Sequence, residues 1–255
     1  LFKSYATQQS NHNIYKILEK IKFMRVAVLY SGGKDSIYAI AHALEKGWDI
    51  AYLLSVKPTR TDCYLFHYAT VEHTKLQAEL LNIPHMLVYC HVANPKLEAC
   101  IIHKIVEKNP VDAVILGGTG LQVTQIKSVQ DALLPLGVET FASHAGYEHG
   151  DLLKDMLNKN YKIMITQFAA EGLDESWLGK ILNQEYFEKL KDLSNKYGFH
   201  IGGDGSAFDS FIVDCPLFKK RIEFRSIIKH RESSFSGYII AEAPVLIEKL
   251  LQKSL

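Results

Sequence analysis

Short apolar runs alternate with amphipathic segments along the first half of the chain. The first run, residues 26–30, is rich in β-branched residues and predicts a buried strand, and residues 37–44 follow with helical periodicity. The same order recurs, with strands expected at residues 48–56, 85–90, 111–116 and 138–141, and helices at residues 71–81, 96–108 and 126–134. Such alternation with short connections predicts an α/β fold with a doubly wound parallel sheet.

The pattern changes near residue 146. Helices are expected at residues 151–160 and 184–197, strands at residues 162–168, 211–214, 221–229 and 237–241, and a terminal helix from Pro244. This half predicts a second, smaller α+β domain with a mixed sheet. We therefore divide the chain into an appended N-terminal segment over residues 1–23, an α/β domain over residues 24–145 and a C-terminal domain over residues 146–255. No chemistry is assigned to the appended segment.

Composition narrows the functional classes. The 255 residues are 47% hydrophobic and 22% charged, with a formal net charge of +1. This balance is ordinary for a globular protein and gives no electrostatic reason for non-specific binding to nucleic acid or to a membrane. The four cysteines are scattered without a C-x-x-C pair, which disfavours a zinc site and indicates reduced thiols in the cytoplasm. No apolar run approaches the roughly 18 residues of a membrane span.

The chemistry concentrates in the turn after the first strand, where Tyr30 is followed by Ser-Gly-Gly-Lys-Asp-Ser, residues 31–36. Gly32 and Gly33 let backbone N–H groups face a ligand, and the helix start favours an anion. Lys34 adds a cation, Ser31 and Ser36 add hydroxyl groups, and Asp35 could bind Mg²⁺ or cap the helix. The turn therefore predicts a phosphate site.

A second glycine turn, Gly117 to Gly120, follows the fourth predicted strand. Ligands of doubly wound sheets bind at the carboxyl ends of the strands, near the point where the strand order reverses. The backbone of this turn could approach an adenine or a ribose, and a simple connecting loop is the alternative.

The first turn resembles the PP-loop of the ATP pyrophosphatase superfamily, whose members have an adenine nucleotide alpha hydrolase-like, HUP-like fold and cleave ATP between its α- and β-phosphates. The other common phosphate motifs, G-x-x-x-x-G-K-[ST] and G-x-G-x-x-G, do not occur in the chain.

Three further motifs narrow the resemblance. They are Gly-Leu-Asp-Glu-Ser-Trp-Leu-Gly at residues 172–179, Phe-Asp-Ser-Phe-Ile-Val-Asp-Cys-Pro-Leu-Phe at residues 208–218, and Tyr-x-x-His at residues 64–67. Together with the PP-loop they resemble the diphthine–ammonia ligase family. The similarity runs from about Arg25 to the C-terminus.

This resemblance implies an AMP-forming carboxylate–ammonia ligase. ATP would adenylate a carboxylate of diphthine, on a modified translation factor, or of another acid, and ammonia would convert the adenylate into an amide. The residues implied to bind ATP are Tyr30, Ser31, Gly32, Gly33, Lys34, Asp35, Ser36, Gly117 and Gly118. Lys34, Asp35 and Ser36 would be catalytic, and Asp35 would also hold Mg²⁺. The implied substrate-binding residues are His67, Asp174, Gly203, Asp204, Ser206 and Asp209. A homodimer is one assembly that this reading allows.

The chain departs from the family pattern in two places. Where the family usually has Gly-Glu-Gly-Gly-Glu-Phe-Glu-Thr, residues 203–210 place Ala207 at the middle acidic position. Where the family tends to have Tyr-Gln-Arg-x-Arg, residues 123–127 retain one cation, Lys127. ATP binding is preserved in this comparison, and a divergent paralogue acting on a different acid is one interpretation of the departures.

Two other functions are weighed against the ligase. A PP-loop enzyme that modifies tRNA is disfavoured by the missing cysteine pair and by the near-neutral charge. A non-catalytic sensor of ATP or AMP is disfavoured because Lys34 and both loop serines are present. His144 and His149 match no zinc-binding spacing, so we expect surface or packing roles for them.

Overall fold

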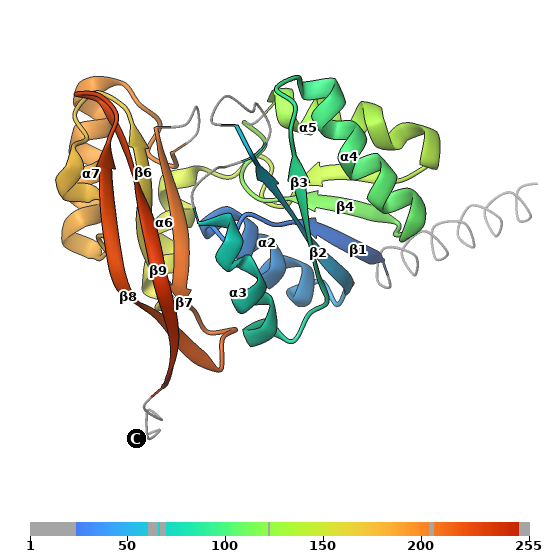
Figure 1. Cartoon of the computed structure of the whole chain (residues 1–255), viewed down its shortest axis with the longest axis horizontal. Coiled ribbons are helices and arrows are strands. Elements are labelled where there is room, and N and C mark those ends of the chain that lie inside the picture. The colour runs from blue at the N-terminus through green and yellow to red at the C-terminus, as the bar shows by residue number, and fades with distance from the viewer. Residues whose placement is uncertain (1–23, 61–65, 67–69, 122, 204–206, 250–255) are drawn as a thin grey trace, which may run out of the picture.

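The computed structural model describes residues 24–60, 66, 70–121, 123–203 and 207–249. His67, Asp204, Ser206, Cys63 and the appended segment 1–23 lie outside these residues. The described chain forms two β-sheets with their helices (Figure 1). In chain order the elements are β1 Arg25–Leu29, α2 Lys34–Glu45, β2 Asp49–Pro58, η1 Val71–His73, α3 Thr74–Leu81, β3 His85–Cys90, α4 Pro95–Lys108, β4 Ala113–Leu116, α5 Val123–Leu133, η2 Leu134–Leu136, β5 Glu139–Ala142, α6 His149–Asn158, β6 Lys162–Ala169, η3 Glu175–Trp177, α7 Gln184–Tyr197, β7 Phe208–Asp214, β8 Lys220–Arg231 and β9 Ser236–Glu248.

The first sheet is five-stranded and parallel, in the order β3-β2-β1-β4-β5. Its two faces are covered by different helices, because side chains from α2 and α3 share one hydrophobic cluster and side chains from α4 and α5 share another. The doubly wound prediction is confirmed. Since the strand order reverses between β1 and β4, the loops that follow these two strands meet at the carboxyl edge of the sheet.

The second sheet has four strands in the order β7-β6-β9-β8. Its paired neighbours are all antiparallel, so the expected mixed sheet is wrong. Helices α6 and α7 contribute Leu153, Met156, Phe187 and Leu190 to the cluster that these strands bury. The α+β composition expected for this half is confirmed.

The predicted terminal helix from Pro244 is also wrong. Residues 244–248 continue β9, where Pro244 pairs with Phe224 and Glu248 pairs with Lys220. Proline is common at helix starts, yet the Val-Leu-Ile run after Pro244 fits a pleated strand equally well, and pairing with β8 determines the strand. Ala243, with φ of +49°, marks an irregularity just before the proline.

The two sheets share one core. Val28 and Ile37 on the side of the parallel sheet belong to the same cluster as Ile163 and Phe211 of the antiparallel sheet. The backbone N–H of Ile212 in β7 donates a hydrogen bond to the oxygen of Gly32, at 3.0 Å. The turn after β1 therefore contacts β7 of the antiparallel sheet as well as the parallel sheet that it belongs to.

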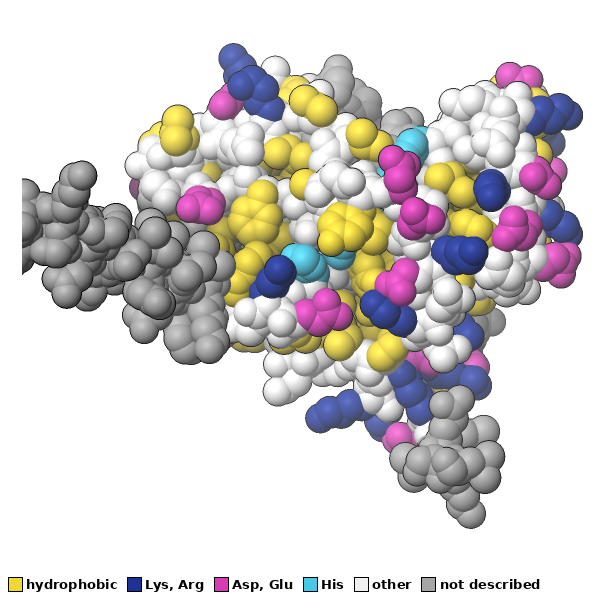
Figure 2. Space-filling model, turned by 180° about the vertical axis from the view of Figure 1, so that it is seen from behind, with side chains coloured by type: hydrophobic (Ala, Val, Ile, Leu, Met, Phe, Trp, Pro, Cys, Tyr) yellow, Lys and Arg dark blue, Asp and Glu magenta, His cyan; other side chains and the backbone are white. Residues whose placement is uncertain are grey.

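The surface seen from behind carries lysine, arginine, aspartate and glutamate side chains dispersed among hydrophobic ones (Figure 2). Within the part of the chain that the structure describes, no helix has the length and apolar character needed to span a membrane.

Candidate active site

The turn between β1 and α2 has the strand–turn–helix geometry expected from the sequence. Gly32 has a φ of +78°, a conformation that L side chains rarely adopt. Gly33 is the N-cap of α2, and a Cβ there would lie 2.9 Å from the backbone oxygen of Ser210. Both glycines are thus needed, the first for its backbone angle and the second for its close approach to β7.

Hydroxyl groups line the inside of this turn. The Ser31 Oγ lies 3.4 Å from the Gly33 nitrogen and 3.4 Å from the Ser36 Oγ. Ser36 donates to the Gly33 oxygen at 3.1 Å and is buried. These contacts hold the turn in shape and place two hydroxyl groups beside the N-terminus of α2, where anions are favoured.

Lys34 and Asp35, the first two residues of α2, form a close ion pair. The Lys34 Nζ lies 2.7 Å from the Asp35 Oδ2, and the two side chains are 6% and 29% exposed. The ammonium group also lies 5.4 Å from the centre of the Phe208 ring. Burial alone would raise the pKa of Asp35, but Lys34 and His149 outweigh it and hold that pKa well below its usual range. Asp35 is therefore ionised at neutral pH.

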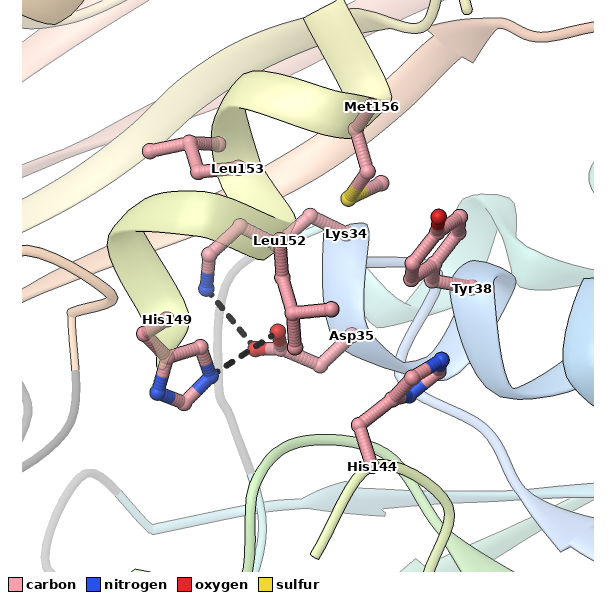
Figure 3. A pocket seen from close by; sticks show the side chains of 8 residues that line it. All are labelled: Lys34, Asp35, Tyr38, His144, His149, Leu152, Leu153 and Met156. Carbon is pink, nitrogen blue, oxygen red and sulfur yellow. Dashed lines mark hydrogen bonds and ion pairs between the residues drawn. The ribbon is translucent and has the colours of Figure 1, made fainter. Parts of the chain in front are cut away.

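His149 supplies a second contact to the same carboxylate. Its Nε2 lies 3.4 Å from the Asp35 Oδ1, and its Nδ1 lies 3.2 Å from the Thr119 Oγ1. Figure 3 shows the Asp35 carboxylate between Lys34 and His149, with Leu152, Leu153 and Met156 of α6 along one side of the small pocket. The expectation of a surface or packing role for His149 is incomplete, because this buried ring contacts a residue of the predicted phosphate site.

The second glycine turn packs directly on the first. A Cβ at Gly117 would lie 2.4 Å from the Asp35 carbonyl carbon and 2.6 Å from the Ser36 nitrogen. Gly118 has a φ of +92°. The structure thus places Gly117 against the first turn of α2, and the predicted contact of this loop with adenosine stays a prediction.

Two residues of this region were missed by the sequence reasoning, Gln77 and Ser210. The Gln77 Nε2 donates to the Gly32 oxygen at 3.0 Å and to the Ile212 oxygen at 2.7 Å, while its Oε1 accepts from the Tyr30 hydroxyl at 2.7 Å. The Ser210 Oγ accepts a hydrogen bond from the Lys34 backbone N–H at 3.2 Å. No motif marks Gln77, which only the packing of α3 brings to the turn. Ser210, in contrast, directly follows Asp209 within the motif at residues 208–218.

The remaining predicted residues are placed as follows. Tyr30 is buried, with its hydroxyl on Gln77, and burial holds its pKa well above the usual value. The Asp174 carboxylate accepts from the Ser176 N–H at 2.8 Å and caps η3. Gly203 has a φ of +83°, and a Cβ there would lie 2.5 Å from the Phe208 oxygen. Asp209 lies in β7, opposite Gln167 of β6. Substrate-binding roles for these residues, and for His67, Asp204 and Ser206, stay predictions.

Two stacked rings, those of Tyr38 on α2 and His144, line the same pocket. The rings of Tyr38 and His144 stack with centroids 4.7 Å apart. The Tyr38 hydroxyl donates to Asp155 and accepts from Lys159, both close to the C-terminus of α6. His144 is 6% exposed, so its expected surface position is wrong and the alternative, a packing role, applies. Burial and the neighbouring His42 lower the pKa of His144 to about 4.

The residues present fit a bound Mg²⁺ ion. This cation is commonly held by one or two carboxylates together with substrate phosphates and water. Asp35 offers an ionised, partly exposed carboxylate next to the hydroxyl-lined turn.

Fold and site together define an α/β protein of the PP-loop class, in which a glycine turn connects the first strand to the N-terminus of a helix. The sequence model of the diphthamide synthase N-terminal domain matches residues 24–133, and that of the diphthamide synthase C-terminal domain matches residues 148–247. The chain belongs to the diphthamide synthase family.

Named relatives agree with this assignment. A Homo sapiens protein named diphthine--ammonia ligase is 31% identical over 239 residues, which cover 84% of this chain and 88% of that protein. The Mus musculus protein of the same name is 32% identical with the same coverage. The Schizosaccharomyces pombe protein of this name is 27% identical over 227 residues, covering 81% of this chain and 37% of that longer relative.

Proposed function

We propose that this protein is an ATP-dependent ligase that forms an amide from ammonia and the carboxylate of diphthine on a translation factor. The observation that carries the proposal is the turn after β1, where Lys34, Asp35 and two serine hydroxyls surround the N-terminus of α2 at the point where the strand order reverses. Membership of a family whose relatives are named diphthine--ammonia ligase supports the choice of substrate.

In the first step, a carboxylate oxygen of the acceptor attacks the α-phosphorus of ATP, and the bond between the α-phosphorus and the bridging oxygen breaks. The products are an acyl-adenylate and pyrophosphate. N–H groups of the turn, the Ser31 and Ser36 hydroxyls and the Lys34 ammonium would stabilise the charge that develops on the leaving pyrophosphate. Lys34 leaves Asp35 for the phosphates in this step, and His149 remains on the carboxylate.

In the second step, ammonia attacks the acyl carbon of the adenylate and the bond from this carbon to the former carboxylate oxygen breaks. AMP leaves with that oxygen, and the nitrogen loses a proton. The reaction depends on the orientation of the carboxylate toward the α-phosphorus more than on a dedicated acid or base. Asp35 is the residue that would hold Mg²⁺, which supplies charge neutralisation for the phosphates when bound. The acceptor would approach from the side of β7, near Asp209.

We also propose that residues 24–145 form the ATP-binding domain and residues 146–255 the substrate domain, and that the protein acts in the cytoplasm. The two matched family ranges lie on either side of this proposed boundary.

The test is a reconstituted assay with ATP, ammonium, Mg²⁺ and a translation factor that carries diphthine. We expect one AMP and one pyrophosphate for each amide formed, and no product when the acceptor is omitted. Formation of ADP and phosphate would contradict the adenylation step. ATP binding without turnover on any carboxylate would favour the sensor, and turnover that requires tRNA would favour the RNA-modifying alternative.

A further inference from the structure

We infer that His149 is a positioning residue for the nucleotide site, which acts by holding the Asp35 carboxylate in place from α6. The inference rests on the proposed function, because it assigns a role at the same site. Three observations support it. The imidazole ring is buried and packed on several sides, its Nε2 contacts one oxygen of Asp35, and His149 belongs to α6 in the other half of the protein.

The ring of His149 is fixed on several sides. It is the first residue of α6 and 2% exposed, and its Nδ1 lies 3.2 Å from the Thr119 Oγ1 in the second glycine turn. Gly202 leaves room for it, because a Cβ there would lie 2.4 Å from the ring's Cγ. The His200 ring lies edge-on, with centroids 5.1 Å apart. A side chain held in this way presents its Nε2 in one direction only.

That direction leads to Asp35. The Nε2 lies 3.4 Å from the Oδ1, while the Lys34 Nζ lies 2.7 Å from the Oδ2, so each oxygen of the carboxylate has its own partner (Figure 3). When the Thr119 hydroxyl donates to Nδ1, the hydrogen of the ring is on Nε2 and faces the carboxylate. Once Lys34 turns to a phosphate, His149 is the partner that keeps Asp35 oriented.

The contact also connects the two halves of the chain. Asp35 is the second residue of α2, which packs on the parallel sheet, and His149 is the first residue of α6, which packs on the antiparallel sheet. Thr119 belongs to the turn whose Gly117 presses on the backbone of Asp35. His149 thus ties the first glycine turn, the second glycine turn and α6 into one unit, and the site is complete only when α6 is docked.

Two conservative substitutions separate positioning from packing. His149→Gln places an amide nitrogen close to the position of Nε2, and His149→Asn places its amide close to the position of Nδ1. The glutamine variant therefore keeps a donor for Asp35, and the asparagine variant keeps the contact with Thr119. Both remove the ring from the same buried position, so both lose similar packing.

Binding of ATP with Mg²⁺ is measured by calorimetry for the two variants and the wild type, and Tm is measured without nucleotide. We expect His149→Asn to weaken binding about tenfold and His149→Gln to stay within about threefold of the wild type, since only the asparagine variant loses the contact of a nitrogen with the Asp35 carboxylate. The two Tm values should fall by similar amounts. Equal binding by the two variants would overturn the inference.

A double-mutant cycle with Asp35→Asn adds a measurement that a packing role would not change. If His149 acts through Asp35, His149→Asn weakens ATP binding in the wild type and has little further effect in Asp35→Asn. Independent, multiplying effects would overturn the inference while leaving the proposed function intact. A wild-type protein that binds no ATP would overturn the proposed function, and this inference with it.

Discussion

Gln77 donates a hydrogen bond from its Nε2 to the backbone oxygen of Gly32, at 3.0 Å, in the turn between β1 and α2. The same amide nitrogen donates to the Ile212 oxygen of β7, and the Gln77 Oε1 accepts a hydrogen bond from the Tyr30 hydroxyl. Gln77 is completely buried. One amide from α3 thus holds the turn, the end of β1 and the antiparallel sheet together.

We expect Gln77→Leu to destabilise the fold by about 2–4 kcal/mol, because it leaves buried polar partners without their hydrogen bonds. The free energy of unfolding is measured by urea denaturation. Gln130→Leu is the matched control, since exposed Gln130 makes one hydrogen bond, to the Thr140 oxygen at 2.9 Å. Equal losses in the two variants would contradict the role of Gln77.

Lys34→Ala tests whether the Lys34 ammonium group stabilises the phosphates of ATP during the reaction. We expect the rate of pyrophosphate release to fall by a factor on the order of 100 or more, because the variant removes the cation placed to stabilise the leaving group. Lys46→Ala, at the exposed C-cap of α2, should leave that rate unchanged. A Lys34→Ala protein with the wild-type rate would show that the ammonium group takes no part in the reaction.

Gly117→Ala tests the packing of the two glycine turns. A Cβ at Gly117 would meet backbone atoms of Asp35 and Ser36 at 2.4 and 2.6 Å, so the start of α2 must shift. We expect a loss of about 1–3 kcal/mol in stability together with weaker ATP binding. Gly150→Ala is the control. Gly150 lies within α6, and a Cβ there would make an ordinary van der Waals contact with Ile201 at 3.6 Å. Wild-type stability and binding in Gly117→Ala would refute the packing argument.

His144 predicts a pH dependence of stability. Its pKa in the folded protein is about 4, against about 6.5 for an unperturbed histidine, so the unfolded chain binds more protons between these values. The contribution of His144 is therefore complete above about pH 6.5 and is lost as the pH falls toward 4. Burial also lowers the pKa of His42 and His85, which act in the same direction.

His144→Phe isolates this contribution, because a phenyl ring can stack on Tyr38 without titrating. Between pH 6.5 and 4 we expect the wild type to lose on the order of 1–2 kcal/mol more stability than the variant, with allowance for solvent screening. Urea denaturation at several pH values measures the difference. Parallel pH profiles for the two proteins would contradict the assigned cause.

Much of the parallel sheet could be predicted from the sequence because its signals are local. The apolar run before Ser31 and the glycines after it specify strand, turn and helix within a dozen residues. The antiparallel sheet was harder, since the fate of Pro244 depends on pairing with Phe224, twenty residues away in the chain. Propensity alone does not decide such a case.

The same distinction applies to the site. Lys34, Asp35 and Ser36 could be selected because they are adjacent in one motif. Gln77 and His149 could not, because each reaches the turn only through the packing of its helix, and a single glutamine or histidine in a sequence carries no sign of that. Long-range contacts place side chains at this site that periodicity and motifs do not reveal.

In the proposed reaction, the acceptor carboxylate attacks the α-phosphorus of ATP. The most direct measurement uses an acceptor whose carboxylate oxygens are labelled with ¹⁸O, followed by mass spectrometry of the AMP formed with ammonium. An acyl-adenylate predicts that each AMP carries one ¹⁸O atom, because the bridging oxygen stays with the phosphate when ammonia attacks the acyl carbon. Amide formation with unlabelled AMP, or with ADP in its place, would contradict adenylation of the carboxylate.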